Sequence, residues 1–471
     1  MNNNSDKAPE FQEIDQALFE TQKKIYPRAI SGYYANLRWF IVWFTQILFF
    51  GTAWLTWNDR QAVLFDLAAR KFYIFGSVFW PQDFIYLAAL LIISALLLFL
   101  VTAVAGRVFC GYACPQSVYT EIFMWIERVI EGDRSARMKL DKLSCPSPRR
   151  IFLKAAKHAA WIAFALWTGF TFVGYFTPIQ TLSQEVLNFN LGPWQLFWIL
   201  FYGLATYGNA GWLREQVCKY MCPYARFQSA MFDKDTLTVT YDAERGEPRG
   251  SRGKTIDFKS KGLGSCVDCN ICVQVCPTGI DIRQGLQYEC IGCALCIDAC
   301  NQVMDKMEYP KGLIRYTTEH AMSLKLDHKG IVQRMTRPRI LIYTGIISLI
   351  ILALVLSVTL RSPLKFDVIR DRGLPRTTEN GSIDNVYRLQ IMNTDENARH
   401  YIIEVSGIPG VTLISDADFD MPAATTRYIP ARVRVPARSG KKGSNKITFV
   451  VRDREDAAVK VTEKAAFLIP R

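Results

Sequence analysis

Histidine is the scarcest metal-binding residue in this chain of 471 residues, which contains only His158, His320, His328 and His400. A haem held between helices needs pairs of histidines that face each other, and only His158 lies near a long apolar run. The sequence therefore argues against a b-type haem bundle. It also lacks a GxGxxG or Walker sequence in a strand–turn–helix setting, so no nucleotide or flavin site is expected.

Charged residues make up only 21% of the chain, and those present carry an excess of positive charge. Lys and Arg number 56 against 43 Asp and Glu, which gives a net charge of +13. Nucleic-acid binding would use such charge, but no basic helix or RNA-binding signature accompanies it, so we expect no nucleic-acid partner. Residues 1–36 contain no early apolar run followed by a small-residue cleavage site, so no secretory signal peptide is predicted.

Long hydrophobic runs, by contrast, are present in five places. A helix that crosses a bilayer needs about 20 mostly apolar residues. The runs that approach or reach this length are residues 37–57, 84–106, 159–176, 193–209 and 340–360. The third and fourth are short and contain Gly and Thr, so each would also suit a buried helix of a soluble core. The aromatic residues at their ends are typical of membrane interfaces instead, and we predict five transmembrane spans.

The distribution of Lys and Arg predicts how these spans are oriented. Residues 107–157 carry ten Lys and Arg, whereas residues 177–192 carry none. Because positively charged loops stay in the cytoplasm, we expect the N-terminus, residues 107–157 and residues 210–339 on that side. The odd number of spans then places residues 361–471 outside. Most of the positive charge is explained by this topology and by contact with anionic lipid.

Eight of the thirteen cysteines form two matched runs in the predicted cytoplasmic region, where disulfides are disfavoured. Each run has the spacing C-x2-C-x2-C-x3-C. This is the pattern of bacterial two-cluster ferredoxins, in which the fourth cysteine of each run binds the other cluster. We therefore predict two [4Fe–4S] clusters. The first takes Cys266, Cys269, Cys272 and Cys300, and the second takes Cys290, Cys293, Cys296 and Cys276.

Zinc is the alternative for these eight cysteines, because C-x2-C pairs also suit zinc sites. Zinc sites do not need three successive cysteines at two-residue spacing followed by a fourth after x3, nor two such runs starting 24 residues apart. The spacing therefore favours iron–sulfur clusters. The second run has Asn301 where the first has Pro277, so the two local turns are expected to differ.

Four further cysteines form two C-x3-C-P motifs, each directly after a predicted span. Cys110 and Cys114 follow the second span, and Cys218 and Cys222 follow the fourth. This repeat predicts an internal duplication, in which the first two spans match the third and fourth. On a helix the spacing puts both sulfurs on one face, one turn apart, so pseudo-twofold packing would gather all four thiols.

Four gathered thiols would suit Cu(I) or thiol–disulfide exchange. The alternative is a structural role, since free cysteine often behaves as a small buried apolar residue and a duplication would copy such a pair. The thirteenth cysteine, Cys145, stands alone, and we interpret it as structural.

The remaining segments predict strands and loops. Residues 236–242 alternate like a strand and precede a Gly/Pro/charge-rich loop at 245–250, which we interpret as a solvated linker. The tail predicts short strands at 386–393, 400–407, 411–415, 428–436, 446–452 and 459–468. Period-2 alternation over about 100 residues predicts an immunoglobulin-like sandwich without the usual inter-sheet disulfide.

The chain resembles the FixG/CcoG/RdxA family of cytochrome c oxidase accessory proteins along nearly its whole length. The resemblance rests on the paired C-x3-C-P motifs, the loop at 245–250, the two ferredoxin runs, the segment 303–316 and the Ig-like tail. Glu308 stands where we expect Gly in relatives, which leaves the cluster ligands untouched.

The resemblance implies a bacterial inner-membrane protein that reduces Cu(II) to Cu(I) for assembly of the copper–haem centre of a cbb-type oxidase. Cys110, Cys114, Cys218 and Cys222 would then handle copper as the substrate, and the eight ferredoxin cysteines would supply electrons through their clusters. The implied partners are oxidase assembly factors or a copper chaperone, together with a cytoplasmic electron donor. Two alternatives stay open, namely a quinol-linked membrane electron-transfer subunit and a non-redox assembly scaffold.

The expected architecture is a multidomain α+β membrane protein with a periplasmic tail. It comprises a cytoplasmic segment at 1–36, a four-span bundle at 37–235, a linker and ferredoxin domain at 236–339, a fifth span at 340–360 and an Ig-like domain at 361–471.

Overall fold

The computed structural model describes most of the chain in two compact units. The described residues are 24–143, 147–254, 261–334, 336–371, 376–378, 380–437 and 439–470. Unit 1 comprises Met1–Gln46, Leu98–Thr168 and Phe201–Ile342, and unit 2 comprises Ile47–Leu97, Gly169–Leu200 and Tyr343–Arg471. Cys145 lies outside the described residues.

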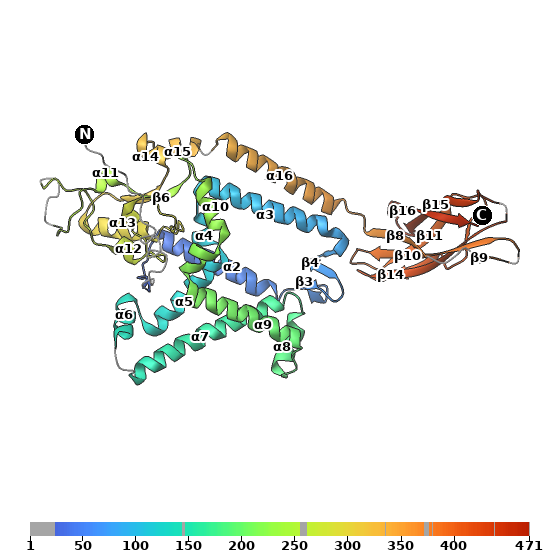
Figure 1. The fold of residues 1–471 in the computed structure, drawn as a ribbon, viewed down its shortest axis with the longest axis horizontal. Coiled ribbons are helices and arrows are strands. Elements are labelled where there is room, and N and C mark those ends of the chain that lie inside the picture. Colours follow the sequence, from blue (N-terminus) through green and yellow to red (C-terminus); the bar gives the residue numbers. More distant parts are fainter. Residues whose placement is uncertain are drawn as a thin grey trace, which may run out of the picture. The chain divides into compact units, whose positions relative to one another are not determined.

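Each predicted span corresponds to a helix, although the helices differ in length and polarity (Figure 1). They are α2 (Tyr33–Thr52), α3 (Phe84–Ala105), α7 (Pro148–Val173), α9 (Pro193–Thr206) and α16 (Pro338–Thr359). Within the described part of the chain, two helices are long and apolar enough to cross a membrane by length and composition, at Pro81–Ala105 and Pro338–Thr359. By length and composition, two of the five predicted spans therefore qualify as helices that could cross a membrane.

Local sequence explains why the other three helices fall short. Arg38 and Gln46 interrupt the apolar face of α2. Helix α7 contains Lys157 and His158 at the start of its apolar part, which lower the mean hydropathy of that part. Helix α9 has only 14 residues and continues into π-helical turns at Tyr207–Leu213.

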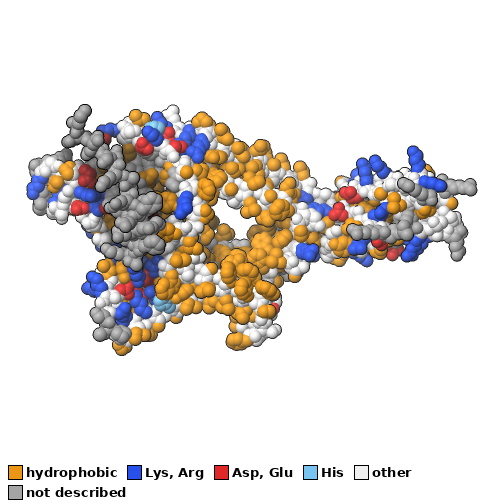
Figure 2. Space-filling model, viewed as in Figure 1, with side chains coloured by type: hydrophobic (Ala, Val, Ile, Leu, Met, Phe, Trp, Pro, Cys, Tyr) orange, Lys and Arg blue, Asp and Glu red, His pale blue; other side chains and the backbone are white. Residues whose placement is uncertain are grey.

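Apolar side chains nevertheless cover the outer surface of the helices. Figure 2 shows hydrophobic side chains over the helical part and charged ones on the ferredoxin and β-sandwich parts. On α2 the exposed residues include Trp43, Phe44 and Ile47, and on α9 they include Trp194 and Leu204. Apolar area of this extent marks a surface that a lipid or protein partner covers.

The tail is a sandwich of two antiparallel sheets around one apolar core. The first sheet has the order β12-β14-β10-β8, with β9 also paired to β10, and the second has the order β13-β11-β15-β16. The fully buried Tyr387, Tyr401, Phe449 and Phe467 fill the space between the sheets. The Ig-like fold class of the tail is thereby confirmed.

Six strands of the sandwich match the predicted runs within a few residues. They are β10 (Ile383–Asn393), β11 (Arg399–Ser406), β12 (Thr412–Leu413), β14 (Thr426–Val435), β15 (Gly443–Asp453) and β16 (Lys460–Ile469). The structure adds β8 (Leu364–Arg370), β9 (Arg376–Thr377) and β13 (Asp418–Met421), which the sequence analysis missed. Strand β13 carries two aspartates among four residues, so its register partner β11, and not its own propensity, explains its formation.

The ferredoxin region is built from short elements, and its two cysteine runs have the same local backbone geometry. Helix α12 (Ile271–Gln274) follows Asn270 and helix α13 (Leu295–Met307) follows Ala294, and both preceding residues are left-handed with φ of 56° and 60°. Each lies directly after the second cysteine of its run. Strand β6 (Thr238–Tyr241) confirms the alternating segment and pairs with β7 (Ile314–Thr317).

Helix α2 is anchored to this region by a cap from α13. Asp298, which lies between two cysteines of the second run, accepts a hydrogen bond from the Ala35 backbone N–H at 2.8 Å. Its carboxylate therefore satisfies one of the free N–H groups in the first turn of α2. A Cβ on Gly32 would lie 2.4 Å from the Asp298 Cγ atom, so glycine permits this approach.

Candidate functional site

The first set of predicted cluster cysteines surrounds one cavity. Cys266, Cys269, Cys272 and Cys300 line it together with Tyr241 and other mostly apolar residues. Three of these cysteines come from the loop around α12, and Cys300 comes from α13. The structure therefore brings the fourth cysteine of the second run to the first run.

The second set surrounds a neighbouring cavity. Cys276, Cys290, Cys293 and Cys296 line it, and Cys272 also reaches its wall. Cys276 is the fourth cysteine of the first run, so the exchange of fourth cysteines is reciprocal.

The chemistry of these cavities fits a [4Fe–4S] cluster in each. Each cavity is lined by its four predicted cysteines, and four is the ligand number that a cubane cluster requires. Burial raises the pKa of the Cys272 and Cys290 thiols to about 11. They are therefore protonated at neutral pH until a metal displaces the protons. Among the described residues, no three His, Cys, Asp or Glu side chains converge on one point closely enough to hold a single ion.

The C-x3-C motif after α3 is not one continuous helix, contrary to the expectation of two sulfurs on one helical face. Cys110 lies in α4 (Val108–Tyr112), whereas Cys114 is extended with φ −60° and ψ 128° and precedes α5 (Pro115–Glu131). Proline disfavours the helical conformation of the residue before it, so the helix ends inside the motif.

The second motif has the same break. Cys218 lies in π-helical turns at Val217–Met221, and Cys222 is extended with φ −82° and ψ 108° before α10 (Pro223–Met231). Each motif therefore has one cysteine in a short helix and one at the N-terminus of the next helix. This shared geometry supports the predicted duplication.

The four thiols of the two motifs still lie close to one another. Burial raises the pKa of Cys110 to about 11, and the neighbouring Cys114 and Cys222 add to this shift. Burial likewise raises the pKa of Cys218 to about 12, with further contributions from the other three thiols. The Cys110 thiol also donates a hydrogen bond to the Gln228 side-chain oxygen at 3.2 Å. The four thiols therefore share one partly buried site that a soft metal ion could enter.

The first motif packs directly on the second cluster loop. A Cβ on Gly111 would lie 2.8 Å from the Ile291 carbonyl oxygen and 2.9 Å from the Cys293 Cα atom. The Tyr112 hydroxyl donates to the Cys293 carbonyl at 3.2 Å. The backbone between Cys110 and Cys114 is thus in van der Waals contact with a cysteine loop of the ferredoxin region.

Arg107 fixes this contact from the side. Its guanidinium donates to the carbonyl oxygens of Ala225 in α10 and Tyr288 before the second run. It also lies 4.7 Å from the centroid of the Tyr288 ring. A single side chain therefore joins both C-x3-C regions to the ferredoxin region.

The sequence did not predict which side chains surround the four span-end thiols. Gln228 belongs to no recognisable sequence motif, and only the packing of α10 brings its side chain to Cys110. Tyr112 and Tyr220 occupy the same place in the two motifs, yet Tyr112 is 5% exposed and Tyr220 is 66% exposed. The two copies therefore have different surroundings despite their shared spacing.

Three family models match this chain. A "4Fe-4S dicluster domain" covers residues 213–319, and a "4Fe-4S binding domain" covers residues 87–131, which include Cys110 and Cys114. A model described as the Ig-like fold at the C-terminus of FixG covers residues 354–470. These matches show that the chain is an iron–sulfur protein with a FixG-type tail.

Curated relatives match over most of their length. The nitrogen fixation protein FixG of Rhizobium meliloti is 38% identical over 84% of this chain and 82% of its own. Protein RdxB of Cereibacter sphaeroides is 41% identical over 90% of this chain and 89% of its own. Protein RdxA of the same organism is 37% identical over 91% of this chain and 92% of its own.

Proposed function

Because the chain belongs to the FixG and RdxA family of iron–sulfur electron-transfer proteins, we propose that it reduces Cu(II) to Cu(I) in a bacterial inner membrane. The reduced copper would serve assembly of the copper–haem centre of a cbb-type cytochrome c oxidase. A copper chaperone or an oxidase assembly factor would receive it, and a cytoplasmic donor would supply the electrons.

The proposed cluster ligands are the cysteines that line each cavity. Cys266, Cys269, Cys272 and Cys300 would hold one cluster, and Cys276, Cys290, Cys293 and Cys296 would hold the other. When bound, [4Fe–4S] clusters store and pass single electrons. The protein surrounds both sites largely with apolar side chains, although Cys269 of the first set is exposed.

The observation that supports copper reduction best is the contact between Gly111 and the loop at Ile291 and Cys293. The motif that contains Cys110 and Cys114 therefore packs against the loop that lines the second cavity, which supports electron transfer to these thiols. One electron converts Cu(II) to Cu(I), and soft thiolate ligands favour the Cu(I) product. Each thiol that binds copper releases one proton.

The membrane placement is part of the same proposal. Helices α2, α3, α7, α9 and α16 would all cross the bilayer, with the ferredoxin region in the cytoplasm and the Ig-like tail in the periplasm. The ten Lys and Arg in residues 107–157 support this orientation.

The test is Cu(II) reduction by the full-length protein with Cys110→Ser and Cys218→Ser combined. We expect the variant to keep both clusters, measured by iron content and electron paramagnetic resonance, and to lose Cu(I) formation, measured with a Cu(I)-specific chelator. Cys145→Ser provides the control for the loss of a cysteine elsewhere. Unchanged copper reduction in the double variant would refute the proposal.

A cavity in unit 1 supports quinol oxidation as the second candidate. This open cavity of about 470 Å³ has Trp161, Trp212 and His158 on its wall. Charged side chains also line it, namely Lys24, Glu127, Asp141, Lys154, Lys157, Arg214 and Glu215. The His158 and Trp212 rings are stacked at 5.9 Å, and the Tyr207 hydroxyl is 3.0 Å from His158 Nδ1. Aromatic walls and an imidazole suit a quinol ring that must lose protons as it is oxidised. Cluster reduction by a quinol analogue in the absence of copper, lost in His158→Ala, would favour this function over the first.

A further inference from the structure

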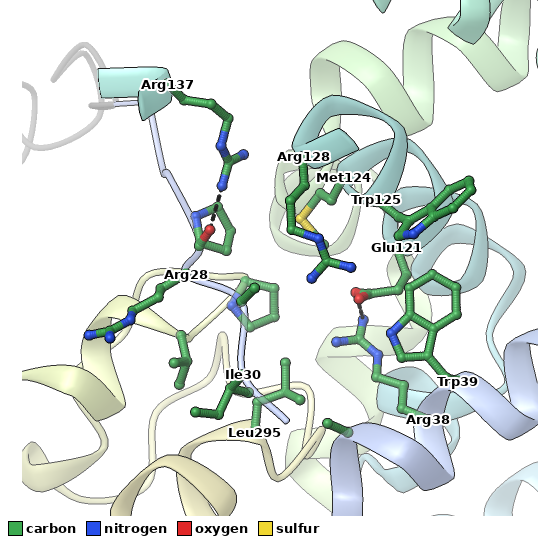
Figure 3. Close-up of a pocket in the computed structure, with 15 residues that line it drawn as sticks. Arg28, Ile30, Arg38, Trp39, Glu121, Met124, Trp125, Arg128, Arg137 and Leu295 are labelled. Atoms are coloured by element: carbon green, nitrogen blue, oxygen red, sulfur yellow. Dashed lines mark hydrogen bonds and ion pairs between the residues drawn. The ribbon is translucent and has the colours of Figure 1, made fainter. Parts of the chain in front are cut away.

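A second basic cavity in unit 1 is not used by the proposed redox chemistry. It has a volume of about 50 Å³ and is lined by residues of the segment before α2, of α2 itself, of α5 and of the ferredoxin region. Figure 3 shows the Arg38 side chain from α2 and the Arg128 side chain from α5 pointing into the space between these helices, with Glu121 beside them.

The charges of this cavity do not balance. Four arginines line it, Arg28, Arg38, Arg128 and Arg137, against the single carboxylate of Glu121. The charge of Arg137 is compensated by Glu127, a carboxylate that does not line the cavity and that accepts a hydrogen bond from Arg137 at 3.1 Å. Glu121 lies 3.1 Å from Arg38 Nη2, and no ion pair joins Arg128 to any residue that the structure describes.

Arg38 is the residue that most requires a further partner. Its side chain is only 3% exposed, and its Nη1 atom has no hydrogen-bond partner among the described residues. A buried polar group without a partner destabilises the folded protein by about 1–3 kcal/mol, and more when it is charged. An anion in the cavity would remove this cost for Arg38 and neutralise Arg128.

The anion is best matched by a phosphate group. The planar guanidinium fork donates two parallel hydrogen bonds to phosphate oxygens, and two arginines from different helices would grip one phosphate from two sides. Inorganic phosphate and the headgroup of an anionic phospholipid share this chemistry.

The walls of the cavity favour the lipid. Trp39 and Trp125 line it, with their rings edge to face at 6.3 Å, and Trp residues concentrate at membrane interfaces. Outside the cavity, the exposed Phe40 and Trp43 lie on the outer face of α2, and the exposed Val129 lies on α5. These apolar side chains would contact acyl chains around the helices while the arginines hold the headgroup.

We propose that Arg38 and Arg128, with Arg28 at the rim, bind the phosphate of an anionic phospholipid between α2 and α5. Basic pockets at the cytoplasmic ends of transmembrane helices bind such headgroups. Here α2 would be the transmembrane wall, and α5, within the cytoplasmic residues 107–157, would be the wall at the membrane surface. The inference rests on the proposed insertion of α2 in the bilayer and does not depend on copper reduction.

The lipid would lie next to the second cluster cavity. Val275, Pro277 and Leu295 line the same arginine cavity, and Arg38 is within electrostatic reach of the Cys276 and Cys293 thiols. A negative phosphate at Arg38 would offset its positive charge there, which makes addition of an electron to that site less favourable.

The test is native mass spectrometry of the detergent-purified full chain titrated with phosphatidylglycerol or phosphatidylcholine. We expect phosphatidylglycerol to bind preferentially and Arg128→Gln to weaken it about tenfold, which corresponds to one charge-assisted contact of about 1.4 kcal/mol. Arg149→Gln is the matched control, because Arg149 is an exposed arginine at the start of α7 outside the cavity. Arg128→Lys keeps the charge without the fork and should bind with intermediate affinity.

Three results would overturn the proposal. Equal loss of phosphatidylglycerol in Arg128→Gln and Arg149→Gln would show general attraction to basic residues. Equal binding of the two lipids would show that the cavity does not select an anionic headgroup. Full displacement of the lipid by millimolar inorganic phosphate would identify a free phosphate site. Retained cluster absorbance in each variant shows that the chain has folded, and loss of copper reduction alone would bear only on the first proposal.

Discussion

Gly111 illustrates how one missing side chain joins two regions that lie far apart in the sequence. The equivalent position in the second motif is Lys219, so the duplication is broken at this residue. Gly111 touches the backbone around Cys293, whereas Lys219 carries a long charged side chain at the matching position. The difference between the two copies therefore marks which motif faces the ferredoxin region.

Substitution of Gly111 tests this contact. In Gly111→Ala the new Cβ would lie 2.8 Å from the Ile291 carbonyl oxygen, and neither backbone can move cheaply. We expect copper reduction by the prereduced protein to slow roughly tenfold or more, because small displacements of reacting groups are costly. Stopped-flow measurement of Cu(I) formation checks this expectation.

The control for this substitution is Gly208→Ala, since a Cβ at Gly208 meets no atom within 4 Å. Both variants should retain their iron. Equal rates in the two variants would show that the contact is not needed for electron transfer.

The cysteine spacing predicted which thiols lie together more completely than it predicted their surroundings, and their ligand roles stay a prediction. All twelve predicted ligand cysteines lie at one of the two cavities or in the group of four span-end thiols. Their spacing carried this information because cluster ligation needs fixed short loops. Gln228, Arg107 and the contact of Gly111 depend on how separate elements pack, which spacing alone does not encode.

At the level of secondary-structure elements, the prediction that each C-x3-C motif lies on one continuous helix was wrong because a proline follows each motif. Pro115 and Pro223 force Cys114 and Cys222 into extended conformations, so each C-x3-C motif bridges two helices. Both prolines are visible in the sequence, and the rule for the residue before proline would have predicted the break. The π-helical turns before Cys218 had no such signal.

The edge strand β13 offers a pH-dependent element. His400 on β11 is hydrogen-bonded to Asp420 at 2.6 Å and also to Asp418, and both aspartates lie on β13. These hydrogen bonds raise the pKa of His400 above its usual value of 6.5. The stabilisation from the protonated ring is therefore complete below about pH 6.5 and is lost as the pH rises through the raised pKa.

We expect the amides of β13 to lose protection against hydrogen exchange as the pH rises above 6.5. The loss should be larger than the increase in the intrinsic exchange rate of unprotected amides over the same pH range. The measurement is hydrogen–deuterium exchange of the full chain between pH 6 and pH 8.5. His400→Gln should remove the extra dependence in β13 and leave β15 unaffected, because its pairing with β16 does not involve His400. A pH profile unchanged by His400→Gln would contradict this account.

At the scale of the whole molecule, composition predicted the parts better than their boundaries. The apolar runs, the cysteine runs and the alternating tail each mark one region, because each depends on a local chemical requirement. Strands β1 (Thr56–Trp57) to β5 (Ser77–Phe79) were missed in the loop after α2, since short strands carry little periodicity. Unit 2 shows their role, because Val78 and Trp80 pack with Met392 of the tail.

The number of spans is the main prediction at this scale, and it determines where the ends of the chain lie. With five spans, residues before α2 and residues in the tail lie on opposite sides of the membrane. If only α3 and α16 crossed, both would lie on the same side and the ferredoxin region would lie on the other. Single cysteine substitutions at exposed positions distinguish these arrangements.

Three such positions are Ser31 before α2, Ser323 at the end of α14 (Glu319–Ser323) and Ala457 in the turn between β15 and β16. We expect a membrane-impermeant maleimide to label Ala457→Cys in intact spheroplasts. Ser31→Cys and Ser323→Cys should be labelled above the level of the parent protein only after lysis. The tail contains no native cysteine, so its labelling has no background of its own. Joint labelling of Ser31→Cys and Ala457→Cys in spheroplasts would establish an even number of spans, and the basic residues of 107–157 would then need another explanation than retention in the cytoplasm.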